Sequence, residues 1–575
     1  MKSNWILKLK ESKTFHYFIL FMISFFLFLP LLKTPITQMH DGRIHVLRVV
    51  GIGQMIQEGK VLPFISPYYC QSFGYAINLF YPPLVTYGPL IFKLFLSSYL
   101  DSMRVFTLLT IFLSGISMYQ FTHQVTKNKI MALVAGVLYI IAPYKLSNIY
   151  IRFALGEITA MLFIPVVFQG VYSLLNEDGK KHYYIAIGAI GLMLTHTITT
   201  FYTAILCILY LLFYLPKLKE KDIWKKGIIN IVFILLITSF FTIPMLEHKI
   251  KGDYVIFDQE VMWTNTDFVS QQTIQPYQFL VNEDAEDRPI YQLGLPLILS
   301  LIVLVFVYKK IEERYQNTYT IFAFLGILCL YMCTKYFPWR ILPDSLGLIQ
   351  FPWRMLGFAS FFLSFLGGVN IGLLLEKLKK NWLKLLLLVL ILILMLITTF
   401  PMLFSFVTEE YQKDYSYEQS AVNKVLLNPY NINREYLPSS TYDKDCKPIL
   451  ERNPNIVELL SGQAEITDQN KQVSNLSMNF HIVQATEGTY IELPYLYYLG
   501  YTITLTQHQE TTILPYTESE GGLIQVQLPE IVQGDIHISY TGTVLMKLSY
   551  LVSFISLIVF VIYIRRTKNE KVLEQ

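Results

Sequence analysis

The fold is decided by the stretch Met39-His40-Asp41-Gly42-Arg43-Ile44-His45-Val46-Leu47-Arg48, which follows the first hydrophobic run almost at once. At about 100° per residue, Asp41, His45 and Arg48 share one narrow face of a helix, and the apolar residues lie mostly on other faces. This pattern is typical of a helix in the membrane interface with its polar side exposed. An acid, an imidazole and a guanidinium beside a bilayer suit the binding or deprotonation of a polar substrate. The alternative is that Asp41-Gly42 forms only a turn or helix cap, because Asp is a favoured cap residue.

The composition indicates a multi-pass membrane protein. The chain has 575 residues, 53% of them hydrophobic, and a mean hydropathy of +0.42. Many apolar runs reach the roughly 20 residues that a bilayer-spanning helix needs. The net charge of +4 is spread over short loops and predicts no nucleic-acid partner. Five cysteines make no disulfide framework, although a bridge between Cys70 and Cys446 stays open.

About twelve transmembrane helices are predicted from the apolar runs. They lie near residues 15–34, 103–124, 130–148, 154–175, 183–198, 200–216, 227–246, 291–308, 319–335, 354–375, 383–405 and 546–564. A further run, 82–100, is short and contains Gly88-Pro89 and Lys93. If 82–100 does not span and the N-terminus is inside, the basic clusters all become cytoplasmic, as the positive-inside rule requires.

This topology places the termini and loops. The protein is predicted to lie in the cell membrane with both termini in the cytoplasm. The first external loop, 35–102, would carry two interfacial helices, and a second large external loop, 247–290, would be acidic. Residues 1–405 form the predicted all-α transmembrane domain, and residues 546–575 form the last transmembrane helix with a cytoplasmic tail.

Residues 406–545 predict a mostly-β, sandwich-like extracytoplasmic domain. Segments such as Tyr501-Thr502-Ile503-Thr504-Leu505 alternate polar and apolar residues, and glycines punctuate them. No convergent set of acid, base and cation is evident in this range. We therefore expect a binding or shielding module that is separable from the chemistry.

Four ionisable residues are predicted at the same external level. Ionisable groups within spans are costly, so each one needs a reason. The helical rise of 1.5 Å per residue places Asp41, Glu157, His196 and Arg354 near the outer ends of their segments.

Each of these groups also has a purely structural interpretation. Arg152 and Glu157 would form an ion pair, although residues five apart do not face each other on a helix. His196 would be a hydrogen-bond partner between helices. Arg354 would reach lipid phosphates beside Trp353 in an aromatic belt.

Two family resemblances follow from these motifs. The early acid, the interfacial helix ending near Gly59, and Tyr81-Pro82-Pro83-Leu84 resemble the integral-membrane GT-C glycosyltransferases, such as protein O-mannosyltransferases and aminoarabinose transferases. A closer resemblance is to bacterial membrane proteins labelled 6-pyruvoyl-tetrahydropterin synthase-related and to the YfhO-like group. It rests on the segments 41–48, 152–157, 195–196, 350–354, 435–438 and 497–540.

The GT-C resemblance implies transfer of a sugar from a polyprenyl-phosphate donor to a cell-envelope polymer, lipid or protein acceptor on the outer face. Asp41 would be the catalytic base. Arg354 with Arg48 would hold the donor phosphate. Sugar or acceptor would be bound by His45, Arg152, Glu157 and His196. No cofactor or metal is expected, since arginines supply positive charge. Two alternatives stay open, a transporter or flippase for a lipid-linked sugar and a non-catalytic envelope assembly protein.

Overall fold

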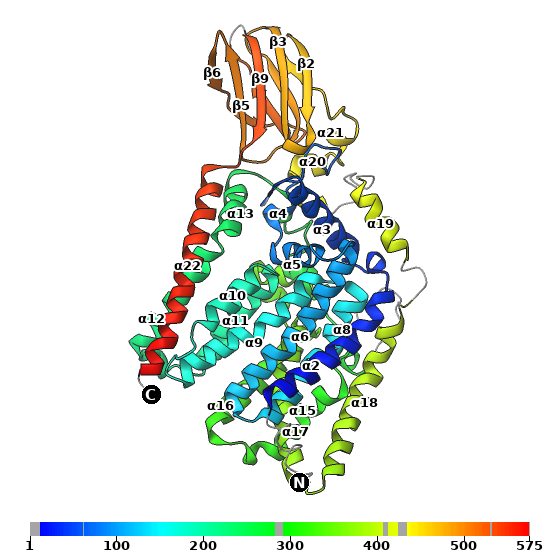
Figure 1. The fold of residues 1–575 in the computed structure, drawn as a ribbon, viewed down its shortest axis with the longest axis vertical. Helices are drawn as coiled ribbons and strands as arrows, with labels where there is room; N and C mark the ends of the chain where they lie inside the picture. Colours follow the sequence, from blue (N-terminus) through cyan, green and yellow to red (C-terminus); the bar gives the residue numbers. More distant parts are fainter. Residues whose placement is uncertain are drawn as a thin grey trace.

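The computed structural model describes residues 12–60, 62–281, 291–405, 407, 412–423, 434–529 and 532–573. The first part of the predicted cytoplasmic N-terminus and the end of the predicted acidic loop, 282–290, lie outside the described residues. The chain forms a bundle of helices with a pair of β-sheets at one end, seen at the top of Figure 1. We call this end of the bundle the sheet end, and the other the opposite end.

The bundle is built from mostly apolar helices of different lengths. They are α2 (Lys13–Phe28), α6 (Tyr99–Thr126), α7 (Lys129–Ile140), α8 (Pro143–Ser147), α9 (Leu155–Asn176), α10 (Tyr184–Met193), α11 (Thr197–Leu212), α12 (Lys221–Ile237), α13 (Ser239–Lys251), α15 (Leu295–Val307), α16 (Glu313–Cys333), α17 (Met355–Lys377), α18 (Asn381–Ser405) and α22 (Val544–Leu573). Among the described residues, seven helices are long and apolar enough to cross a membrane, or eight if α12 and α13, bent by 71°, form one span.

The predicted count of about twelve spans is not established by helix length. The twelve predicted stretches fall mainly on helices, but α10 has only 10 residues, α15 has 13, and α11 has 16. Helices of this length are shorter than the usual span of about 20 residues. The count and the orientation of the termini therefore stay predictions.

The predicted first external loop contains three α-helices, α3 (Gly42–Gln57), α4 (Ile77–Phe80) and α5 (Leu84–Lys93). The expectation that α3 exposes its polar side is wrong, because His45 is only 4% exposed and Arg48 only 6%. The segment from 62 to 80 and later parts of the chain cover α3. Helix α5 has 10 residues, or about 15 Å, half the thickness of a bilayer core.

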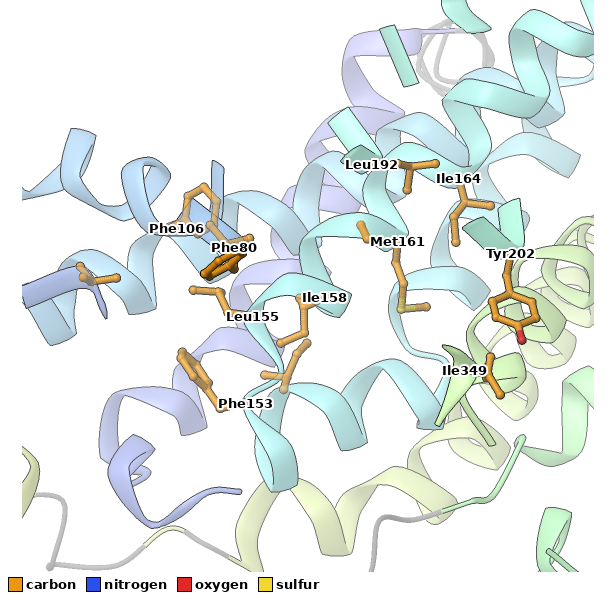
Figure 2. Close-up of a cluster of buried hydrophobic side chains, with 14 of the residues drawn as sticks. Phe80, Phe106, Phe153, Leu155, Ile158, Met161, Ile164, Leu192, Tyr202 and Ile349 are labelled. Carbon is orange, nitrogen blue, oxygen red and sulfur yellow. The ribbon is translucent and has the colours of Figure 1, made fainter. Parts of the chain in front are cut away.

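Helix α9 lies at the centre of the bundle core. Figure 2 shows Leu155, Ile158, Met161 and Ile164 along it, with Leu192 of α10 and Tyr202 of α11 in the same cluster. All of these side chains are at most 2% exposed. Burying a large apolar side chain stabilises a fold by about 1.5–3 kcal/mol. This packing fixes the start of α9, where Glu157 lies.

Two antiparallel sheets form the β-rich region. One has the order β1-β4-β8-β7 and the other β2-β3-β9-β5-β6. The strands are β1 (Glu458–Ser461), β2 (Ala464–Gln472), β3 (Ser477–Ala485), β4 (Tyr490–Leu496), β5 (Tyr501–Gln507), β6 (Glu510–Ile513), β7 (Tyr516–Glu518), β8 (Leu523–Gln527) and β9 (Val532–Tyr540). Alternate residues are buried, as in β5, where Tyr501, Ile503 and Leu505 point inward. The alternation that predicted strands is therefore the pattern that builds the shared core.

The final helix, α22, runs from the sheets beside α13 and α12 (Figure 1). The Ser553 hydroxyl accepts from the Phe240 amide at 2.9 Å and lies 2.8 Å from the Ser239 hydroxyl. These bonds supply partners to the chain at the break between α12 and α13, where helical backbone groups lose their regular partners. The C-terminal end of α22 and the start of α2 lie at the opposite end.

The range 406–545 contains helices as well as strands. Its strands occupy only residues 458–540, and α19 (Gln412–Val422), α20 (Ser439–Asp443) and α21 (Lys447–Leu450) precede them. The Asp414 carboxylate accepts from the Ile36 amide at 2.6 Å, and Glu418 accepts from the Tyr99 amide at 2.6 Å. Helix α19 thus fastens the first loop to α6, and the functional separability of the β-rich region stays a prediction.

Candidate functional site

One cavity of about 430 Å³ opens where the first loop, α9, α11, α13 and α17 meet. Its lining includes all seven residues that the sequence singled out, Asp41, His45, Arg48, Arg152, Glu157, His196 and Arg354. Four separate segments of the chain supply them, 41–48, 152–157, 196 and 354. The volume falls in the range of about 300–1,000 Å³ that is usual for small-molecule sites.

Asp41 immediately precedes α3, and its carboxylate does not cap the described residues of that helix. It occupies the N-cap position, but its side chain accepts no capping hydrogen bond from the described helix residues. Its carboxylate lies 3.3 Å from the Arg152 guanidinium and is 44% exposed. The backbone here is tight, because a Cβ at Gly42 would lie 1.8 Å from the Ile36 carbonyl oxygen. Asp41 is therefore a positioned and accessible acid, and the cap alternative accounts for its place but not for its side chain.

Arg152 and Glu157 form an ion pair of 2.9 Å in spite of their spacing. The helix breaks between them at Phe153, which adopts the left-handed conformation with φ of 50°. Such a conformation in a non-glycine residue costs about 1–3 kcal/mol, so the surrounding packing must impose it. The break turns Arg152 back toward the first turn of α9. Glu157 also accepts bonds from the Tyr144 hydroxyl and, at 3.2 Å, from the Asn148 amide.

Arg354 reaches the same cavity from the start of α17 and is not satisfied there. Its terminal nitrogen donates to the Ile349 carbonyl at 2.8 Å and to the Gln350 side chain at 2.7 Å. The Nε of Arg354 lies 3.7 Å from the Glu157 carboxylate. This nitrogen is buried and has no hydrogen-bond partner among the described residues. A buried guanidinium with an unused donor is suited to an incoming anion. The side chain does not extend to the bundle surface, which argues against the lipid-anchoring alternative.

His45 and Arg48 line the wall that α3 provides. The Arg48 guanidinium donates to Glu435 at 2.6 Å and to the Tyr436 hydroxyl at 2.8 Å, and it lies 3.6 Å from the centre of the Tyr81 ring. Burial opposes the charge on Arg48, but Tyr436 and Glu435 outweigh it and raise the pKa of Arg48. Burial, followed by the positive charge of Arg48, lowers the pKa of His45 well below its ordinary value. His45 is therefore a neutral imidazole at pH 7.

His196 lies between α10 and α11 and caps the second of these helices. Its Nδ1 accepts from the Thr199 amide at 3.3 Å and lies 2.7 Å from the Thr199 hydroxyl. This local role replaces the hydrogen bond between helices that the sequence suggested. The capping bonds use one ring nitrogen only, and the residue still lines the cavity.

Several functional candidates escaped the sequence reasoning. The cavity lining also contains Tyr81, Lys249, Gln350, Glu435 and Tyr436. Tyr81, Gln350 and the Glu435-Tyr436 pair lie inside motifs that carried the family resemblance, and that was the available signal. Lys249 sits near the end of α13 with nothing in its sequence to mark it.

The lining has an excess of positive charge at neutral pH. It combines four cationic side chains, Arg48, Arg152, Arg354 and Lys249, with three carboxylates, Asp41, Glu157 and Glu435. Two carboxylates are held by arginines within the wall, whereas Asp41 is partly open. Chemically, the cavity can attract an anion and present one carboxylate to a neighbouring hydroxyl.

Comparisons with known proteins cover most of the chain. Residues 79–407 match the model of a family described as "6-pyruvoyl-tetrahydropterin synthase related domain; membrane protein". An uncharacterized protein of Lactococcus lactis subsp. cremoris (strain MG1363) is 24% identical over 591 residues, covering 95% of this chain and 94% of that protein. The archaeal oligosaccharyltransferase AglB from Archaeoglobus fulgidus, solved with an inhibitory peptide and a dolichol-phosphate, aligns with a TM-score of 0.40 and 12% identity. That alignment covers 78% of this chain and 68% of AglB.

Proposed function

The chain belongs to the 6-pyruvoyl-tetrahydropterin synthase related family of membrane proteins, and we propose that it is a glycosyltransferase that uses a polyprenyl-phosphate sugar. The sugar would pass to a hydroxyl of a cell-envelope acceptor on the outer face of the membrane. The family description names a pterin enzyme, but the proposal rests on the cavity.

One observation carries the proposal. An accessible carboxylate, Asp41, and a buried guanidinium with an unused donor, Arg354, face the same cavity. Glycosyl transfer from a lipid phosphate needs both groups, because a proton leaves the acceptor while negative charge grows on the departing phosphate.

The reaction would divide between these residues. The acceptor oxygen attacks the anomeric carbon, and Asp41 takes the proton from that oxygen. The bond between the anomeric carbon and the phosphate oxygen breaks, and its electron pair leaves with the polyprenyl phosphate. Arg354 and Arg48 would bind that phosphate, since planar guanidinium groups match phosphate geometry. Arg152 would hold the Asp41 carboxylate in place, and His45 and His196 would bind sugar hydroxyls.

The proposal is tested with polyprenyl phosphate, the product that every polyprenyl-phosphate sugar donor releases. Purified protein in lipid nanodiscs is titrated with a short-chain polyprenyl phosphate, and bound lipid is counted by native mass spectrometry. We expect Arg354→Gln to weaken binding by about tenfold or more, because it removes a charge-assisted contact. Arg340→Gln is the matched control, since Arg340 is 66% exposed and lies outside the cavity lining. Equal binding by both variants and the wild type would contradict the proposal.

A further inference from the structure

A second pocket, of about 300 Å³, lies at the opposite end of the bundle between α2, α6, α9 and α10. Its mouth carries the exposed lysines Lys13, Lys127 and Lys181, and tyrosines form its walls. None of its lining residues belongs to the cavity described above. The proposed glycosyl transfer makes no use of it.

Two buried glutamines at the floor of this pocket have unmet acceptors. Gln124 and Gln169 are each 4% exposed, and neither side-chain oxygen has a hydrogen-bond partner among the described residues. The orientation of the Gln124 amide is fixed, because its nitrogen donates at 2.6 Å to Glu177, and an ionised carboxylate can only accept. A buried acceptor without a donor is costly, so a ligand that supplies N–H or O–H groups would be favoured here.

The mouth of the pocket is positively charged. Lys127 is paired with Glu177 at 3.0 Å, whereas Lys13 and Lys181 make no ion pair within the part of the chain that the structure describes. The ring of His123 lies parallel to Tyr119 beside them, with an interplanar angle of 3°. Among the described residues, the pocket therefore combines two ammonium groups without an ion pair at its mouth with two acceptors without a hydrogen bond at its floor.

We propose that this pocket binds a phosphate ester whose alcohol part carries hydroxyl or ammonium donors. Lys13 and Lys181 hold the phosphate, and the donors of the alcohol part bond to the oxygens of Gln124 and Gln169. This chemistry is found in the headgroup of an anionic glycerophospholipid and in soluble glycerol phosphate. The inference is independent of the proposed glycosyl transfer.

The test uses full-length protein in phosphatidylcholine nanodiscs doped with one of two anionic lipids. Phosphatidylglycerol carries donors, and phosphatidylmethanol has the same charge without them. Bound lipid is counted by native mass spectrometry. We expect the wild type to prefer phosphatidylglycerol, and Lys13→Gln with Lys181→Gln to weaken binding of both lipids by about tenfold. Gln169→Met should remove the preference and leave phosphatidylmethanol binding unchanged.

The control removes the same charge elsewhere at the same end. Lys219→Gln with Lys221→Gln alters exposed lysines that lie outside this pocket's lining, and it should change neither lipid. Competition with soluble glycerol phosphate distinguishes a lipid headgroup from a soluble phosphate ester as the ligand. Displacement of the lipid identifies a soluble ester as a ligand, and no displacement assigns the site to the lipid headgroup. Equal losses in the two double variants, or no preference in the wild type, would overturn the proposal.

Discussion

Two arginines, Arg104 and Arg354, differ in whether one of their buried donors lacks a hydrogen bond. Arg104, on α6, is 1% exposed and donates to Asp414 at 3.3 Å, to Tyr415 at 3.1 Å and to two backbone carbonyls. Its Asp414 partner is fully buried and accepts from the first loop. Arg354 in the cavity has a buried Nε without a hydrogen-bond partner among the described residues.

This difference in hydrogen bonding distinguishes an arginine that joins parts of the fold from an arginine that can bind a ligand. The donors of Arg104 are taken up by partners on the first loop, α6 and α19, so it joins these parts of the chain. Arg354 lines the cavity, and its Nε has no hydrogen-bond partner among the described residues, so this side chain can meet a ligand. Burial of an ion is therefore not sufficient evidence for a site, and an unused donor that faces a cavity is the more specific sign.

The largest effect is expected from a substitution that breaks the ion pair of Arg104 with Asp414. Arg104→Met leaves Asp414 as a buried charge without its cation, which costs about 3–5 kcal/mol. We expect a large drop in thermal stability in detergent, with donor binding per folded molecule unchanged. Arg340→Met, at an exposed arginine, should leave the melting temperature almost unchanged. A stable Arg104→Met protein with lost donor binding would reverse the assignments of the two arginines.

Asp41→Asn should have the largest effect on chemistry. The substitution keeps the size of the side chain and most of its hydrogen bonding but removes its capacity to accept a proton. General-base catalysis contributes about 10²–10⁴-fold, so turnover of a polyprenyl-phosphate sugar should fall at least a hundredfold. Donor affinity and melting temperature should stay close to the wild type. Wild-type turnover would exclude Asp41 as the base.

Arg354→Lys sharpens the comparison, because it keeps the charge. An ammonium lacks the planar fork that fits phosphate and does not replace the bonds to Ile349 and Gln350 in the same geometry. Affinity for polyprenyl phosphate should fall about tenfold, measured by titration in nanodiscs. The same substitution at Arg340 should have no effect, and unchanged affinity in Arg354→Lys would show that charge alone suffices.

The stability of the cavity wall should depend on pH through His45. Burial and Arg48 lower the pKa of folded His45 below the unfolded value, so the unfolded chain binds more protons below about pH 6.5. The contribution of neutral His45 is complete above pH 6.5 and is lost as the pH falls toward its folded pKa. Between pH 7.5 and 5.5 the wild type should lose about 1 kcal/mol more than His45→Gln, measured by thermal unfolding. Parallel pH profiles would refute this role.

Glu435→Gln should have the smallest effect. The variant keeps an acceptor for Arg48 but removes its anionic partner, which the structure places 2.6 Å away. A freer Arg48 changes the phosphate site only slightly, so donor affinity should change about threefold. The exposed Glu520→Gln is the control. An effect as large as that of Arg354→Lys would place Glu435 at the centre of the site.

Much of the site was visible in the sequence because ionisable residues near the ends of apolar runs are rare and stand out. Arg152, Glu157, His196 and Arg354 were selected in this way, Asp41, His45 and Arg48 by their shared helix face, and all seven line one cavity. The Arg104–Asp414 cluster was missed because its members lie 310 residues apart and neither belongs to a motif. The burial of α3 was missed because periodicity shows which face is polar but not what covers that face.

The sequence by itself determined the membrane class, the main helices and strands such as β5, because hydrophobic periodicity is a local property of the chain. Only the tertiary structure decided the ion pair of Arg152 with Glu157, because the backbone turns at Phe153 against the preference of that residue. It also decided that residues 435 and 436 reach the cavity, although the sequence placed them in the predicted extracytoplasmic domain. Contacts of this kind depend on packing between distant segments, whose free energy no local pattern records.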